Sequence, residues 1–163
     1  VGRLGKFYLY FADHAGSHIK LAYADKISGP WTLCKGGVLD LAAFTDAYDH
    51  VASPDIFIDC AKNEVRLYFH ARSHERAREQ WTFAATSSDG LNFRPATDEP
   101  LAPFYLKHFL WDGKFTVCLK VATSGAPRMD SHHSNLVVIH SIEVFQQNSG
   151  TTSPALYVML GCI

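Results

Sequence analysis

The sequence predicts an all-β domain, and three observations point to this class. Apolar residues make up 47% of the 163 residues and aromatic residues 13%, which suits strands with large packed faces. Short apolar runs that begin at turn residues recur along the chain. No long window shows the 3.6-residue period of a helix, and only residues 41–49 could form one short helical turn.

The apolar runs form a repeat. Residues 5–11 read GKFYLYF, residues 63–69 read NEVRLYF and residues 113–119 read GKFTVCL, and each predicts a strand. A following strand is predicted at residues 18–25 and 80–87, and a preceding strand at residues 51–59 and 105–111. The unit is an antiparallel meander of about four strands that recurs at about 50 to 60 residues, the size of a β-propeller blade.

The chain supplies about two to three such blades, where a closed ring needs roughly four to eight. We therefore predict a single partial propeller domain over residues 1–163, with part of a blade at 1–45, a blade at 48–98 and a partial blade at 103–163. On this interpretation the chain is a fragment of a longer protein. Pairing of blades between chains and a smaller β-sandwich are the alternatives.

Charge and composition exclude several classes of protein. The net charge of −1 and the absence of a clustered basic surface argue against a nucleic-acid partner, and residues 72–78 are expected to form a solvated loop. No apolar run is long enough for a transmembrane helix, so no membrane partner is predicted. No cofactor or metal is predicted, because the nine histidines show no ligand spacing, although a bound calcium ion is left open. The cysteines are widely spaced and are expected to be buried free thiols in a reducing, cytoplasmic compartment: Cys34, Cys60, Cys118 and Cys162.

Meander geometry predicts where polar side chains gather. The second strand of a blade runs opposite to the first, so its end lies on the same face of the disc as the start of the first strand. Polar residues occupy such positions in all three units, and a face of this kind suits a hydroxyl-rich ligand. The predicted substrate-binding residues are Asp13, His14, His50, His70, Arg72 and His108.

The motif at residues 53–56, SPDI, predicts a further polar position. Pro54 lacks an amide donor, so it fits the start of a strand or a bulge. Asp55 would then face the central channel if alternation directs Ile56 into the core between blades. An acid in that place needs a hydrogen-bonding or charged partner.

These motifs resemble a known family. Residues 8–14, 21–25, 29–31 and 50–56 read YLYFADH, LAYAD, GPW and HVASPDI, and they resemble the five-bladed propeller glycosidases of glycoside hydrolase family 43, of the arabinanase and β-xylosidase type, or a divergent branch of them. The resemblance extends from Lys6 to about Lys120. It implies three carboxyl groups around the axis: a general base, a general acid and a supporting carboxylate that tunes the acid's pKa.

Asp55 matches the supporting carboxylate, and we predict it as the catalytic-site residue of this chain. The base would precede Val1, and the glutamate expected as acid on the third blade has no clear occupant, since Glu99 and Glu143 lie outside convincing motifs. The resemblance therefore implies a glycoside hydrolase-like propeller that acts on plant or microbial polysaccharide or oligosaccharide and is catalytically incomplete in this chain. A non-catalytic carbohydrate-binding or scaffold propeller is the alternative. A glycoside phosphorylase, with a phosphate pocket formed by Arg72, Arg76 and Arg78, is a further option.

Overall fold

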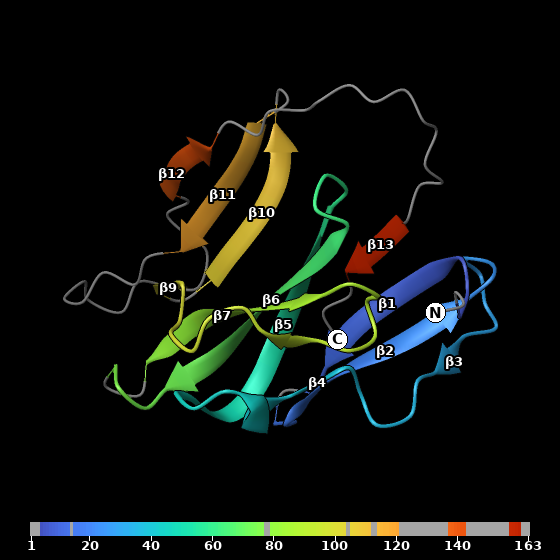
Figure 1. The fold of residues 1–163 in the computed structure, drawn as a ribbon, viewed down its shortest axis with the longest axis horizontal. Coiled ribbons are helices and arrows are strands. Elements are labelled where there is room, and N and C mark those ends of the chain that lie inside the picture. Colours follow the sequence, from blue (N-terminus) through green and yellow to red (C-terminus); the bar gives the residue numbers. More distant parts are fainter. Residues whose placement is uncertain are drawn as a thin grey trace, which may run out of the picture.

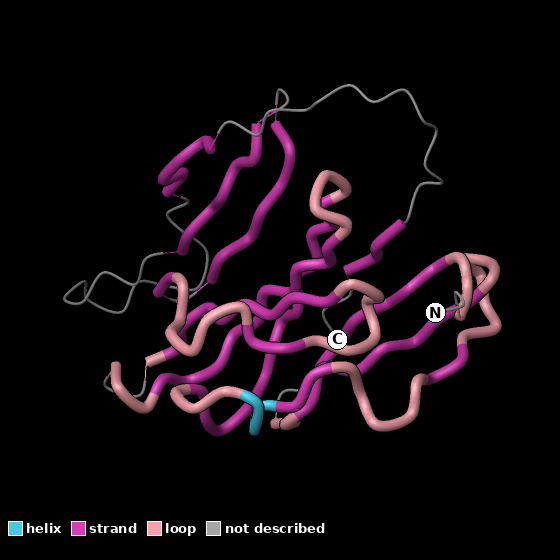
Figure 2. The backbone as a smooth tube through the Cα atoms, in the orientation of Figure 1, coloured by secondary structure: helices cyan, strands magenta, loops and turns pink. Residues whose placement is uncertain are grey.

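The structure, a computed structural model, describes residues 4–13, 15–76, 79–103, 105–111, 114–120, 137–142 and 157–160; after residue 103 the only side chain that it describes is that of Leu106. These residues form three sheets, whose main strands are blue, green and gold in Figure 1, and a red strand from the C-terminal part of the chain joins the blue sheet. Figure 2 shows that strands and loops make up the described backbone except for one short helical turn. The predicted all-β class is confirmed.

The first sheet is an antiparallel meander with one added strand. Its meander strands are β1 (Phe7–Ala12), β2 (His18–Ala24), β3 (Thr32–Leu33) and β4 (Leu39–Asp40). The two short outer strands both pair with β2. The other edge of β1 pairs in parallel with β13 (Tyr157–Leu160), which satisfies backbone groups that an open edge would leave unpaired. Within the stretch 103–163, predicted as one partial blade, the described residues Tyr157–Leu160 thus belong to the first sheet.

The second sheet is the largest and follows the predicted meander closely. Its strands are β5 (Ala47–Asp59), β6 (Glu64–Ser73), β7 (Gln80–Ser87), β8 (Arg94–Pro95) and β9 (Ala102–Pro103). β5 begins earlier than residue 51, the predicted start, because its register shifts twice, between Tyr48 and Ala52 and between Ala52 and Asp55. Such bulges let a long strand stay paired while it bends.

The turn that connects these two sheets is short and specific. The Asp40 side chain accepts a hydrogen bond from the Ala42 amide at 3.0 Å and so begins the 3-10 turn η1 (Leu41–Ala43) within the predicted stretch 41–49. Phe44 follows the turn and packs against Phe69, with ring centroids 5.0 Å apart in an edge-to-face arrangement. The turn thereby delivers an aromatic side chain into the core.

The third sheet contains three strands in antiparallel order. They are β10 (Tyr105–Trp111), β11 (Lys114–Lys120) and β12 (Val137–Ile142). The first two strands match the predicted ones at 105–111 and 113–119 closely. β10 lies against β5 and β7 of the second sheet, so the third sheet packs on the second.

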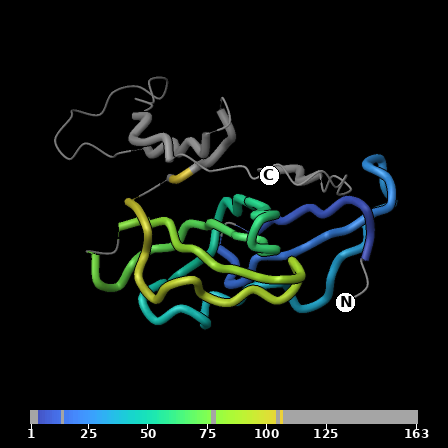
Figure 3. The backbone as a smooth tube through the Cα atoms, turned by 45° about the horizontal axis from the view of Figure 1, so that its top comes forward, coloured from blue at the N-terminus to red at the C-terminus, as the bar shows by residue number. Residues whose placement is uncertain are grey.

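One core joins the first two sheets, which lie side by side in Figure 3. Along β6, Leu67, Phe69 and Ala71 all point into this core and are fully buried, as the two-residue period of a strand requires. Ile19 and Leu21 of β2 meet them from the first sheet. Burying a side chain of this size contributes about 1.5–3 kcal/mol, so this core is the main source of stability for both sheets.

The prediction of buried thiols is wrong for Cys60. It is exposed, because it lies in the turn between β5 and β6, and Cys34 is half-buried. Cys118 and Cys162 lie outside the residues whose side chains are described. Over the described residues, no helix has the length and apolar character that crossing a membrane requires.

Candidate functional site

Loops of the first two sheets meet at one edge of the second sheet. The loop after β1 runs through Asp13 and Gly16, and the Gly16 carbonyl accepts a hydrogen bond from the Val51 amide at 2.9 Å. Val51 follows His50 in β5, and Tyr48, earlier in the same strand, pairs with Arg72 at the end of β6. The structure therefore places the loop that contains Asp13 near the part of β5 and β6 that contains His50 and Arg72. Their role in binding stays a prediction.

Three charged or titratable side chains at this edge form what we name the rim cluster: Asp49, His50 and Arg72. Asp49 Oδ2 lies 3.2 Å from Arg72 Nη1 and 3.6 Å from His50 Nδ1. Arg72 is 48% and Asp49 44% exposed, whereas the His50 side chain is 11% exposed. The Asp49 carboxylate thus lies close both to the guanidinium of Arg72 on β6 and to the imidazole of His50 on its own strand, at the surface of the sheet.

The backbone around the rim cluster is unusual. Asp49 has φ 80° and Ser53 has φ 49°, although neither is glycine. Both lie where the register of β5 shifts. Left-handed conformations are rare for residues with a Cβ, and bulges often redirect side chains beside functional sites. Asp49 stands beside His50 at the predicted polar start of the strand, but it is not among the predicted binding residues; Asp is one of the few residue types that tolerate this conformation.

Asp55 is buried in β5, with 3% of its surface exposed. It lies directly opposite Tyr68 in β6, so the two side chains share one face of the sheet. Ile56 points into the core of the first two sheets, as the sequence predicts, and alternation directs Asp55 to the opposite face, toward the third sheet. Burial raises the pKa of the Tyr68 phenol, and the charges of Asp55 and Glu64 raise it further, against the lowering effect of Arg66.

His70 lies on the same face as Tyr68, two residues further along β6. It is 1% exposed, and it pairs with Ala52 and Thr82 of the neighbouring strands. The Leu106 amide of β10 donates to Thr82 Oγ1 at 3.2 Å, which attaches the third sheet at this point. His70 therefore lies in a buried seam between sheets and not on the open edge with Arg72.

Another acidic residue near this edge, Asp46, holds the local structure together. Asp46, immediately before β5, accepts hydrogen bonds from Ser73 Oγ at 2.7 Å and from the Glu75 amide at 2.9 Å. Arg76 Nη1 lies 3.5 Å from its carboxylate. Burial alone would raise the pKa of Asp46, but these partners together hold it below the usual value. The carboxylate therefore fixes the turn between β6 and β7.

Arg76 also helps to hold this turn in place. Besides Asp46, it contacts Glu99 at 3.4 Å and lies 4.9 Å from the Trp81 ring centroid. The predicted solvated loop is thus partly packed. Glu99 is 81% exposed and pairs only with this arginine among the residues described, which does not fit a general acid.

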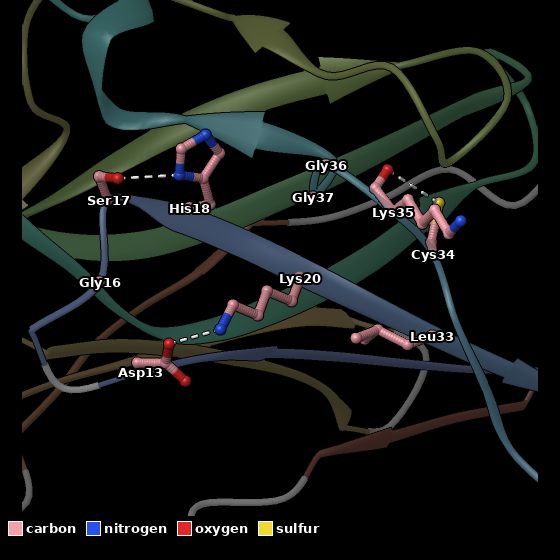
Figure 4. Close-up of a pocket in the computed structure, with 10 residues that line it drawn as sticks. All are labelled: Asp13, Gly16, Ser17, His18, Lys20, Leu33, Cys34, Lys35, Gly36 and Gly37. Carbon is pink, nitrogen blue, oxygen red and sulfur yellow. Dashed lines mark hydrogen bonds and ion pairs between the residues drawn. The ribbon is translucent and has the colours of Figure 1, made fainter.

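The first sheet has a hollow of about 390 Å³ next to the rim, within the range of sugar-sized ligands (Figure 4). Asp13 lies on one side of it and pairs with Lys20 at 2.5 Å, while Ser17 Oγ and His18 Nδ1 are 2.8 Å apart. Lys35 lines the other side, beside the turn through Gly36 and Gly37. Among the described residues that line the hollow there is no Phe, Tyr or Trp, and most of the side chains that a sugar could meet there are polar or charged.

Some predicted residues lie outside the description. These are His14, Arg78 and Glu143, and, as regards its side chain, His108, whose backbone is in the middle of β10. Within the described part of the chain, no group of three His, Cys, Asp or Glu side chains is arranged to hold a metal ion.

Comparison with known proteins supplies further information. No protein-family model matches the chain. Over 122 residues it is 34% identical to an uncharacterised protein of Acanthamoeba polyphaga mimivirus, a match that covers 69% of this chain and 34% of the viral protein. The chain thus spans about a third of the length of that relative.

Among solved structures, the chain is similar to a glycoside hydrolase family 43 β-xylosidase/α-arabinofuranosidase from a compost microbial metagenome, in complex with xylotriose and in calcium-free form. The TM-score is 0.54 at 22% identity, over 63% of this chain and 31% of that enzyme. It is also similar to an α-L-arabinofuranosidase from Clostridium thermocellum, with a TM-score of 0.50 at 12% identity over 82% of this chain and 46% of that enzyme. The chain has the fold of a partial β-propeller. At these identities the likeness defines the fold, and the five-bladed ring stays a prediction.

Proposed function

We propose that the chain is part of a glycoside hydrolase-like propeller and that it binds an oligosaccharide at the edge formed by Asp13, His50 and Arg72. The observation that carries the proposal is the position of Asp55. It is a buried acid on β5, in a fold shared with family 43 enzymes, and the motif around it is the one that resembles their supporting carboxylate.

The chemistry of glycoside hydrolysis gives such an acid a defined task. The general acid must keep its proton until it protonates the leaving oxygen, which needs a raised pKa. A carboxylate nearby raises that pKa by charge repulsion. Asp55 is assigned this supporting role, with the general acid and base supplied elsewhere in the complete protein. The rim side chains supply donors and acceptors for sugar hydroxyls.

Binding and catalysis are tested separately. Titration of this chain with xylotriose, followed by amide NMR shifts, should perturb residues 15–17, 49–51 and 70–72; a spectrum that stays unchanged at millimolar sugar would refute the binding site. In the complete protein, Asp55→Asn should abolish glycosidase turnover. Asp59→Asn, the same change at the far end of β5, should retain it. Undiminished turnover in Asp55→Asn would remove Asp55 from the mechanism.

A non-catalytic carbohydrate-binding propeller is the second candidate. It is favoured by Glu99, which is exposed and paired with Arg76, whereas a catalytic acid needs an enclosed position beside the substrate. Binding of xylotriose without product, in the complete protein, would support it. The phosphorylase option has less support, because Arg72 and Arg76 are each already paired with a carboxylate, Asp49 and Asp46.

A further inference from the structure

Asp49 adopts a conformation that is unfavourable for its residue type. Its φ of 80° lies in the left-handed region, inside a strand and not in a turn. Asn63 also has positive φ, at 49°, but it lies in the tight turn between β5 and β6, where this conformation is ordinary. A conformation of this kind persists only where surrounding contacts impose it.

The ion pairs of Asp49 do not stabilise the fold enough to explain why the chain keeps this strained conformation. Its ion pairs with Arg72 and His50 are at 3.2 and 3.6 Å, and its side chain is 44% exposed. Exposed ion pairs contribute little to folding, because water screens the charges and the side chains lose entropy. The strained backbone instead has a geometric effect: it places one carboxylate between an imidazole and a guanidinium that come from two strands.

In this geometry, His50 and Arg72 each keep a hydrogen-bonding group that Asp49 does not use. Asp49 Oδ2 lies 3.6 Å from His50 Nδ1, beyond hydrogen-bonding distance, and its negative charge favours the proton on that nearer nitrogen, which would leave Nε2 as the acceptor of the neutral ring. Arg72 uses one nitrogen toward Asp49 and keeps further N–H donors at a side chain that is 48% exposed. An acceptor and a set of donors side by side match two neighbouring hydroxyls of a neutral sugar.

We propose that Asp49 is a positioning residue of the sugar site: it fixes the tautomer of His50 and the orientation of Arg72, and the strand is strained to hold it there. This inference rests on the proposed function, since it assumes that the rim cluster meets the sugar. It names adjacent hydroxyls on a neutral sugar as the group that the cluster recognises.

The test uses three variants of this chain. Asp49→Asn removes the charge and keeps a residue that tolerates positive φ, and Asp49→Gly removes the side chain and the strain. Asn63→Gly relieves the same type of conformation at the turn and is the matched control. Both Asp49 variants should bind xylotriose at least about tenfold more weakly, because charge-assisted contacts are lost. Asp49→Gly should nevertheless unfold at no lower temperature than the wild type, and the control should bind normally.

The nitrogen NMR signals of the His50 ring separate the two proposals. In the wild type they should report the proton on Nδ1, and in Asp49→Asn they should move toward the tautomer mixture of a free imidazole. Failure of the wild-type chain to bind xylotriose would refute the proposed function. Unchanged His50 signals in Asp49→Asn, or wild-type affinity in Asp49→Gly, would refute the positioning role of Asp49.

Discussion

Replacement of Asp46 by Asn tests whether one buried carboxylate holds the turn between β6 and β7. Asp46 is 6% exposed, and it accepts bonds from Ser73 Oγ at 2.7 Å and the Glu75 amide at 2.9 Å. Hydrogen bonds to a charged group contribute about 1.5–3 kcal/mol each. Asn keeps one acceptor oxygen, so the variant loses one such bond and the charge that faces Arg76. We expect a loss of about 2–3 kcal/mol in the free energy of unfolding.

For a chain of this length, each kcal/mol shifts Tm by about 2–4 °C, so the variant should melt about 4–12 °C lower near neutral pH. The pH dependence has a definite sign. The pKa of Asp46 in the folded state is below its ordinary value of 3.8, so its contribution is present above that value and is lost as pH falls through the folded-state pKa. The Tm difference between the wild type and Asp46→Asn should therefore narrow as pH is lowered toward about 3.

Thermal unfolding followed by circular dichroism at several pH values is the assay. Asp98→Asn is the matched control, because it is the same change at an exposed residue and should leave Tm almost unaltered. Equal Tm values for the wild type and Asp46→Asn at neutral pH would refute the anchoring role. A difference that stays constant down to acid pH would refute the electrostatic explanation of it.

Two further stability predictions use urea unfolding. A Cβ on Gly37 (φ 74°) would lie 2.9 Å from the Ile19 carbonyl oxygen, whereas one on Gly36 (φ 85°) meets nothing within 4 Å. Both alanine variants incur the left-handed penalty of about 1–2 kcal/mol, and Gly37→Ala should cost clearly more; equal losses would contradict the close contact. Tyr10→Phe leaves the buried Gly90 carbonyl, now 2.8 Å from the hydroxyl, without this donor and should cost about 1–3 kcal/mol. Because burial raises the pKa of Tyr10, alkaline absorbance titration should show this phenol ionising only when the fold opens.

The sequence predicted the strands well where the signal is local. The predicted strands at 18–25, 80–87 and 105–111 lie within a residue of β2, β7 and β10, because side-chain alternation and turn residues are both short-range patterns. The parallel pairing of β13 with β1 was not predictable in this way. It joins residues about 150 positions apart, and no local pattern specifies which distant strand covers an edge.

The sequence indicated at which strand ends the candidate residues lie, but not how deeply their side chains are buried. Meander geometry fixes where strands end, and the structure places the Asp13 loop, His50 and Arg72 near one another; their part in binding stays a prediction. It does not fix how deeply a side chain is buried, so His70, at 1% exposure, was not distinguished from Arg72. The backbone conformation of Asp49 was not predictable, because it lies where the register of β5 shifts, and such bulges arise from pairing across strands and leave little trace in composition.

The contacts between the first two sheets also determine how the protein unfolds. The Phe93 amide donates to the Val38 carbonyl at 3.2 Å, and the Tyr10 hydroxyl donates to the Gly90 carbonyl, so each sheet completes the hydrogen bonding of the other. Separating the two sheets would expose the apolar side chains of their shared core to water. The two sheets should therefore open as one cooperative unit, and amides at the centres of β2 and β6 should exchange with solvent at the same slow rate.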